Sequence, residues 1–272
     1  MRIQLYNEPA AAPTGNPEDN FSPYLDTFLL PGAKDPLGAV LVFPGGGYSH
    51  RAAHEGDPVA RRFNELGFHA FVLQYRTQPY TYPAPQTDAA RAMKIIRANA
   101  EKWGVIPDNI AVCGFSAGGH LAACTGILAD KFNADQNDEA DKFSPKADAM
   151  LLSYGVLSTT WTYTDRGHKL PEGSCYCDEN GKEIDPWLLI DDNTPPAYIW
   201  HTATDGSVPV ECSTAFAREM WKRNLTCELH IYPAGPHGRG LGLGYQDVVS
   251  WSREAAIFLE ASCGFKRAVY FK

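Results

Sequence analysis

Short apolar runs alternate with helical segments along most of the 272-residue chain. In the first half, residues 39–43 (AVLVF), 69–76 and 109–116 are typical of buried strands. The segments between and after them, residues 56–67, 87–104 and 117–128, have the spacing and the terminal Pro and Gly residues of helices. Such alternation pairs the strands in parallel and covers both faces of the sheet with helices. The sequence therefore predicts an α/β fold.

The second half continues the pattern, with strands predicted at residues 148–157, 197–203 and 227–233 and helices at 210–224 and 245–262. Residues 2–6 and 24–30 are possible edge strands. Residues 158–194 interrupt the alternation, because they are polar and contain Gly, Pro, two Cys and two Trp. We predict that residues 1–272 form a single domain and that residues 158–194 are an insertion, a lid or cap over the site.

Composition excludes several classes of partner. The net charge of −8 and the pI near 5.5 argue against nucleic acids and anionic membranes. The N-terminus lacks the apolar core of a secretory signal, and the seven cysteines fit a reducing compartment, so a cytoplasmic location is expected.

Cys175 and Cys177 form the one close pair of cysteines in the sequence, and without nearby ligand residues they are a weak signal for a metal site. We expect no metal and no cofactor.

The stretch Gly114–His120, GFSAGGH, lies where a predicted strand turns into a predicted helix. Gly-x-Ser-x-Gly in this context is the pattern of a nucleophile elbow. A sharp turn would present Ser116 at the carboxyl end of the sheet, and a Cβ at Gly114 or Gly118 would clash with the neighbouring strand or helix. The backbone N–H of Ala117 would then point toward a developing oxyanion. The alternative is a small-residue turn with an idle serine.

A serine hydroxyl needs a base to accept its proton. His237 lies in a Gly- and Pro-rich loop directly after the predicted strand 227–233, which is the position expected for that base. His201 and His230 lie inside predicted strands and are expected to be structural. His120 lies one helical turn beyond Ser116 and is expected to pack against neighbouring segments.

The acid that orients the base should follow a strand between the serine and the histidine. Asp205 lies just beyond the predicted strand 197–203 and before a helix, and it is our candidate. Asp191 and Asp192 precede that strand at its wrong end, and Asp165 in the irregular segment is the second choice. The alternative for Asp205 is a simple turn residue, because Asp-Gly is common in turns.

The sequence PGGGY at residues 44–48 directly follows the predicted strand 39–43. Glycines let a backbone approach a substrate closely, so the N–H groups of Gly46 and Gly47 are predicted to join Ala117 in an oxyanion hole. The segment lacks the residue patterns of a phosphate-binding loop.

These motifs resemble, in combination, those of the α/β-hydrolase esterases related to acetylxylan and feruloyl esterases. The resemblance is carried by FPGGGYSHRAAHEG, VLQYR, DAARAMKIIRANAEKWGV, GFSAGGHLAA, DNTPPAYIWHTATDGSVP and HIYPAGPHGRGLG, and it runs from about Pro23 to Leu259. It implies an α/β-hydrolase fold, the triad Ser116, Asp205 and His237, and an oxyanion hole in the PGGGY loop. Pro44 stands where hormone-sensitive-lipase relatives have His, which favours the carbohydrate-esterase branch.

The implied activity is serine-dependent hydrolysis of short acyl esters, acetyl above all, on small-molecule or oligosaccharide substrates. A general short-chain carboxylesterase, a feruloyl esterase and an amidase or formamidase use the same triad and stay open, as does a non-catalytic binding protein. Tyr48, beside the oxyanion loop, and Trp161, in the insertion, are the candidate substrate contacts. The other aromatic residues of the insertion could stack on sugars or simply pack: Tyr163, Tyr176 and Trp187. The oligomeric state is left open.

Overall fold

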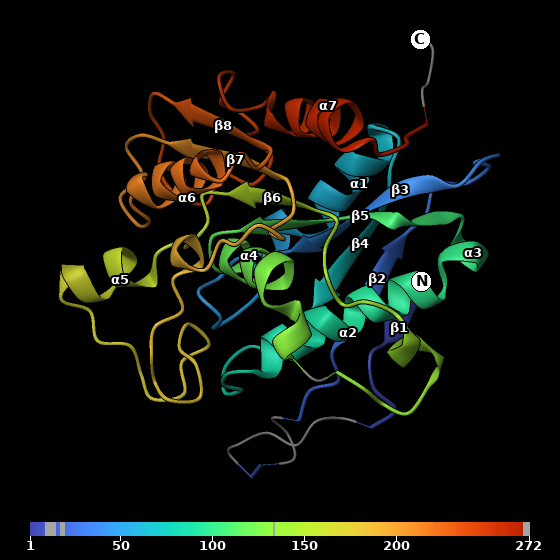
Figure 1. Ribbon diagram of the computed structural model, residues 1–272, viewed down its shortest axis with the longest axis horizontal. Coiled ribbons are helices and arrows are strands. Elements are labelled where there is room, and N and C mark those ends of the chain that lie inside the picture. The colour runs from blue at the N-terminus through green and yellow to red at the C-terminus, as the bar shows by residue number, and fades with distance from the viewer. Residues whose placement is uncertain (9–14, 17–19, 133, 269–272) are drawn as a thin grey trace.

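The computed structural model describes residues 1–8, 15–16, 20–132 and 134–268. The described residues form one eight-stranded sheet, in the order β1-β2-β4-β3-β5-β6-β7-β8 (Figure 1). The strands are β1 (Arg2–Gln4), β2 (Tyr24–Phe28), β3 (Leu37–Phe43), β4 (His69–Gln74), β5 (Val105–Phe115), β6 (Ala149–Ser153), β7 (Ala197–Thr202) and β8 (Cys227–Tyr232).

The sheet is parallel from β4 through β3 and β5 to β8, and it is antiparallel only where β1 pairs with β2 and β2 with β4. The carboxyl ends of six strands therefore meet at one edge, where loops can gather functional side chains. The mostly parallel sheet predicted from the sequence is confirmed.

The main helices are α1 (Asp57–Glu65), α2 (Ala84–Ala98), α3 (Ala100–Trp103), α4 (Ala117–Ile127), α5 (Thr159–Thr162), α6 (Glu211–Lys222) and α7 (Trp251–Cys263). Short 3-10 turns occur at Ala53–Glu55 (η2), Ala129–Lys131 (η3), Glu139–Lys142 (η4), Thr164–Arg166 (η5) and Pro186–Leu188 (η6). Two predicted helices differ from these bounds. The helix predicted at 87–104 is broken at Asn99, and the one predicted at 245–262 begins only at Trp251, because residues 245–250 form turns.

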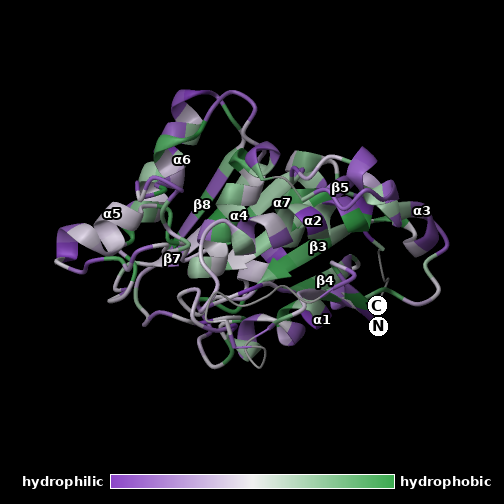
Figure 2. Ribbon diagram, turned by 90° about the horizontal axis from the view of Figure 1, so that it is seen from below, coloured by the Kyte–Doolittle hydropathy of each residue, from purple (hydrophilic) through white to green (hydrophobic). Residues whose placement is uncertain are grey.

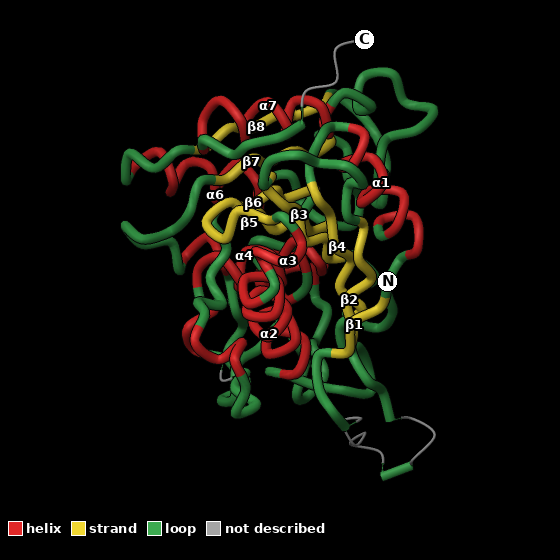
Figure 3. Tube along the Cα trace, turned by 90° about the vertical axis from the view of Figure 1, so that its right-hand side faces the viewer, coloured by secondary structure: helices red, strands yellow, loops and turns green. Residues whose placement is uncertain are grey.

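Each strand sends alternate side chains to the two faces of the sheet. Leu41 and Phe43 belong to the buried cluster that includes residues of α2, α4 and α6, whereas Val40 and Val42 belong to the cluster that includes residues of α1 and α7. Figure 3 shows α2 and α4 on one side of the sheet, and Figure 2 shows the strongly hydrophobic colouring of β3 between the helices. Two apolar clusters, one on each face, thus hold the strand ends in fixed positions.

Residues 158–194, the segment predicted to be an insertion, contain the short elements α5, η5 and η6 and an isolated bridge between Cys177 and Glu183. Within the part of the chain that the structure describes, no helix combines the length and apolar character needed to cross a membrane.

Candidate active site

Ser116 occupies a strained turn between β5 and α4. Its backbone φ of 54° lies in the left-handed region, which residues other than glycine rarely adopt. A Cβ on Gly114 would lie 2.0 Å from Gly118 O, and a Cβ on Gly118 would lie 2.1 Å from Phe43 O. The two glycines therefore let β3, β5 and α4 approach closely enough to form the turn, which is the reason the sequence suggested.

A chain of hydrogen bonds joins three residues that lie far apart in the sequence. The Ser116 hydroxyl lies 2.7 Å from His237 Nε2, and His237 Nδ1 lies 2.7 Å from Asp205 Oδ2. Ser116 follows β5, Asp205 follows β7 and His237 follows β8, so all three stand beyond carboxyl ends of parallel strands. With Nδ1–H donated to the carboxylate, Nε2 accepts from the hydroxyl and can take its proton.

The Asp205 carboxylate is fully enclosed by donors. Oδ1 accepts from the N–H groups of Ser207 and Val208, at 2.8 and 3.0 Å. The buried His201 places Nε2 3.3 Å from Oδ2. Burial by itself raises the pKa of Asp205, but the hydrogen bonds from His201 and His237 outweigh it and hold that pKa well below its usual value. Asp205 thus stays ionised while it orients His237.

The glycine loop after β3 runs against Ser116. A Cβ on Gly45 would lie 3.1 Å from the Ser116 Cβ. Gly46 and Gly47 have φ values of 121° and 63°, conformations that favour glycine. Among the described residues, no protein acceptor takes a hydrogen bond from the N–H of Gly46, Gly47 or Ala117. These three donors are free to stabilise a negative oxygen beside Ser116.

His120 is buried and serves the scaffold, as expected. It accepts from the Tyr48 hydroxyl at Nδ1 (2.9 Å) and donates from Nε2 to Ile184 O (3.2 Å). Burial lowers the pKa of His120 to about 4, so the ring is neutral near pH 7. Through these contacts α4 is tied to the glycine loop on one side and to the insertion on the other.

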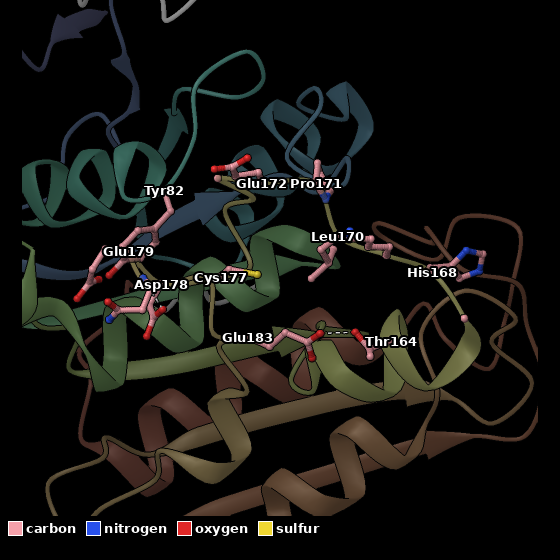
Figure 4. Close-up of a pocket in the computed structure, with 15 residues that line it drawn as sticks. Tyr82, Thr164, His168, Leu170, Pro171, Glu172, Cys177, Asp178, Glu179 and Glu183 are labelled. Carbon is pink, nitrogen blue, oxygen red and sulfur yellow. Dashed lines mark hydrogen bonds between the residues drawn. The ribbon is translucent and has the colours of Figure 1, made fainter.

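Two cavities lie along the insertion. One, of about 630 Å³, is bounded by Gly47 and Tyr48, by residues 78–81, by Gly206 and Ser207 and by residues of the insertion between 162 and 176. It therefore touches both the glycine loop and the loop of Asp205. The other, of about 990 Å³, lies between residues 164–173 and 177–183 and also contacts Tyr82 (Figure 4). Residues 168–173 border both cavities.

The two predicted substrate contacts differ in their surroundings. Tyr48 lines the 630 Å³ cavity and its ring lies 4.9 Å from that of Tyr176. Trp161 lines neither of these two cavities, and its ring stacks on Trp187 at 4.9 Å between centroids. The structure thus brings Tyr48 to the cavity beside the site and leaves Trp161 packed within the insertion.

Two residues near the site escaped the sequence reasoning. Glu55 is buried and Tyr154, which follows β6, places its ring 5.0 Å from that of His237. Glu55 directly precedes the helix predicted at residues 56–67, and Tyr154 lies within the strand predicted at residues 148–157. Neither position distinguishes a functional residue from a structural one, so the sequence contains no signal for them. Asp165 is located in η5 and takes no part in the hydrogen-bond chain.

The described residues contain no group of three or more His, Cys, Asp or Glu side chains that could hold a metal ion. Cys175 and Cys177 are buried free thiols, and Cys175 Sγ donates to Tyr80 O.

A sequence profile for the family described as BD-FAE matches residues 25–220, which is most of the chain. The chain belongs to the BD-FAE family. Its resemblance to the acetylxylan and feruloyl esterase group, expected from the motifs, is confirmed by this match and by the relatives that follow.

A solved acetyl ester-xyloside bifunctional hydrolase from Caldicellulosiruptor lactoaceticus is 36% identical, with a TM-score of 0.85, and the match covers 98% of this chain and 97% of that one. The endo-1,4-beta-xylanase B of Butyrivibrio fibrisolvens is 35% identical over 73% of this chain, and the acetylxylan esterase of Xylanibacter ruminicola is 29% identical over 80% of it. The match covers only 32% and 46% of these two curated relatives. The α/β-hydrolase fold is confirmed.

Proposed function

We propose that this BD-FAE protein hydrolyses short acyl esters, acetyl esters of xylose-based saccharides in particular, with Ser116 as the nucleophile. The observation that carries the proposal is the hydrogen-bond chain Ser116–His237–Asp205 beside three backbone donors that have no acceptor within the described part of the chain. The names of the relatives, which include an acetylxylan esterase and an acetyl ester-xyloside hydrolase, support the class of substrate.

The proposed reaction has two halves. In the first, Ser116 Oγ bonds to the ester carbonyl carbon while its proton passes to His237 Nε2, and the carbonyl oxygen becomes an oxyanion. The oxyanion collapses, the bond to the alcohol oxygen breaks, and the alcohol leaves with the proton from His237. In the second half, water gives a proton to His237 Nε2 as its oxygen bonds to the acyl carbon. The bond from that carbon to Ser116 Oγ then breaks, His237 returns the proton to Oγ, and the free acid leaves.

The neighbouring groups lower the barriers of both halves. Asp205 fixes the tautomer of His237 and stabilises the imidazolium that forms. The N–H groups of Gly46, Gly47 and Ala117 stabilise the oxyanion, at about 3 kcal/mol for each donor. These steps require no metal and no organic cofactor.

The 630 Å³ cavity suits a saccharide acetate. Its walls combine aromatic rings, from Tyr48, Tyr80, Tyr163 and Tyr176, with polar groups such as Gln78 and Thr81. Aromatic faces and hydrogen-bonding side chains together are what a sugar ring requires. We assign Tyr48 to the cavity wall. We assign Trp161 no substrate contact, since its ring is stacked on Trp187.

We also propose that the protein acts in the cytosol on small oligosaccharides, because all seven cysteines are free thiols. Activity on acetylated oligomers should then exceed activity on intact acetylated xylan. Faster deacetylation of the polymer would contradict this part of the proposal.

The decisive assay compares p-nitrophenyl esters from acetate to octanoate with acetylated xylo-oligosaccharides, a feruloyl ester and a matched acetanilide. We expect fast acetate turnover that falls with chain length, release of acetate from the oligosaccharides, and loss of at least about 10⁴-fold in kcat for Ser116→Ala. A preference for octanoate or for the feruloyl ester would favour a general carboxylesterase or a feruloyl esterase. Cleavage of the anilide alone would favour an amidase, and no turnover at all would favour a binding protein.

A further inference from the structure

Glu55 is a buried carboxylate that the proposed reaction does not use. It ends the short turn η2, eleven residues after Pro44, and only 2% of its surface is exposed. Burying a carboxylate is costly unless its oxygens are hydrogen-bonded. Both oxygens of Glu55 have such partners, and the two partners belong to opposite sides of the active site.

The first partner belongs to the glycine loop. Glu55 Oε2 accepts from the Gly45 N–H at 2.8 Å, and the carbonyl of Pro44, on the same peptide unit, accepts from the Tyr75 hydroxyl at 2.5 Å. Both the carbonyl and the N–H of the Pro44–Gly45 peptide unit are therefore held by hydrogen bonds. The next peptide unit along the chain carries the N–H of Gly46. A Cβ on Gly45 would lie 2.7 Å from Glu55 Oε2, so glycine at this position lets the carboxylate come close.

The second partner leads to the loop of His237. Glu55 Oε1 accepts from the Tyr154 hydroxyl at 2.5 Å, and the same hydroxyl accepts from the Gly240 N–H at 2.8 Å. Burial and the adjacent carboxylate of Glu55 raise the pKa of Tyr154 well above its usual value, so the hydroxyl keeps the proton that it donates. The same loop has a second contact with this region, because Gly238 O accepts from Nε2 of His54, the neighbour of Glu55, at 3.0 Å.

We propose that Glu55, acting through Tyr154, is a positioning residue that fixes the oxyanion loop relative to the general base His237. The inference rests on the proposed function of Ser116. The oxyanion donors and the base must act on one tetrahedral intermediate. Gly46 and Gly47 lie in the loop after β3 and His237 lies in the loop after β8, with three strands of the sheet between β3 and β8. The link Gly45–Glu55–Tyr154–Gly240 crosses that distance through three hydrogen bonds.

The test measures kcat and KM for p-nitrophenyl acetate with Glu55→Gln, Tyr154→Phe and the double variant. Gln keeps an acceptor for Gly45 but turns a donor toward the Tyr154 hydroxyl. Phe keeps the ring against His237 and removes the hydroxyl. We expect each single variant to lower kcat about 10- to 100-fold with KM changed less than about threefold, because misplacement of about 1 Å has costs of that size. We expect the double variant to be no slower than the slower single variant, because both break one link.

Asp148→Asn is the matched control. Asp148 is likewise a carboxylate bonded to a backbone N–H, of Ile110, and to a second side chain, of Arg97, but it precedes β6 at the opposite edge of the sheet. We expect this variant to lower the melting temperature and leave kcat unchanged. A wild-type kcat in folded Tyr154→Phe, or kcat losses that multiply in the double variant, would overturn the inference even if Glu55→Gln does not fold. The proposed function would instead be refuted if the wild-type protein had no esterase activity. It would also be refuted if Ser116→Ala were as active as the wild type.

Discussion

The elbow at Ser116 and the insertion at residues 158–194 are built in different ways. β5 beyond Ile110 and nearly all of α4 are buried, and backbone atoms of three elements meet there at contact distance. The insertion has buried residues at its base, Ser158, Thr159 and Asp185, whereas residues 164–169 are exposed. The chemistry is thus fixed by backbone packing, and the shape of the cavity depends on a few side-chain hydrogen bonds.

The first way to test this contrast is to add one methyl group in each region. A Cβ at Gly118 would overlap the backbone oxygen of Phe43 at 2.1 Å, whereas a Cβ at Gly181 in the insertion would meet nothing within 4 Å. We expect Gly118→Ala to destabilise the protein by at least about 4 kcal/mol or to prevent folding. Gly181→Ala, at φ 76°, should cost about 1 kcal/mol. Urea unfolding measures both, and equal losses would refute the contrast.

The second prediction concerns the base of the insertion. Asp185 accepts from the N–H groups of Thr159 and Thr160, at 2.5 and 3.1 Å, and from the Thr160 hydroxyl at 2.7 Å. Asp185→Ala leaves the two N–H groups without a partner, at a cost of about 2 kcal/mol, whereas the Thr160 hydroxyl keeps Glu183 Oε2 as an acceptor at 2.7 Å. Because residues 162–176 line the cavity, we expect a several-fold higher KM for acetylated xylo-oligosaccharides and a kcat for p-nitrophenyl acetate within about threefold of wild type.

Asp185→Asn is the control for this effect, since it keeps one acceptor oxygen and should lie between wild type and Asp185→Ala. A drop in kcat equal to that of the triad variants would mean that the insertion also holds the reacting groups in place.

The buried His120 makes the stability of the folded protein depend on pH. The pKa of His120 is about 4 in the folded protein, below its ordinary value of 6.5, so unfolding takes up a proton between these values. The stability that comes from keeping His120 neutral is therefore complete above pH 6.5 and is lost as the pH falls toward 4. From pH 6.5 to 5 the loss is about 2 kcal/mol.

Urea titrations at pH 7, 6 and 5 on wild type and His120→Asn isolate this effect, because the variant lacks the titrating ring. The slope of stability against pH should be shallower in His120→Asn. If stability changed with pH equally in the wild type and in His120→Asn, the His120 ring would not be the neutral group that joins the glycine loop to the insertion.

The contrast also explains which features the sequence could predict. Gly114, Gly118 and the glycines after β3 are required by close backbone approach, and such requirements leave a pattern that can be read from one sequence. The parallel pairing of the strands and the positions of Asp205 and His237 beyond strand ends follow from the same regular alternation. The late start of α7 was missed because the turns at 245–250 contain apolar residues at spacings that also suit a helix.

Glu55, Tyr154 and the packing of Trp161 could not be predicted, because they depend on side chains that meet only in the folded chain. Glu55 and Tyr154 are 99 residues apart and join through one hydrogen bond. The sequence makes Trp161 a candidate substrate contact in the insertion, whereas its ring is stacked on Trp187. Within an irregular segment, neither periodicity nor spacing says which aromatic rings face a cavity.

The most direct test of the central claim is intact and peptide mass spectrometry after reaction with a fluorophosphonate, which traps an activated serine. We expect one phosphonyl adduct per chain, located on Ser116, and a rate of adduct formation that falls at least about 10³-fold in His237→Ala. No adduct, an adduct on another residue, or labelling that does not depend on His237 would contradict it.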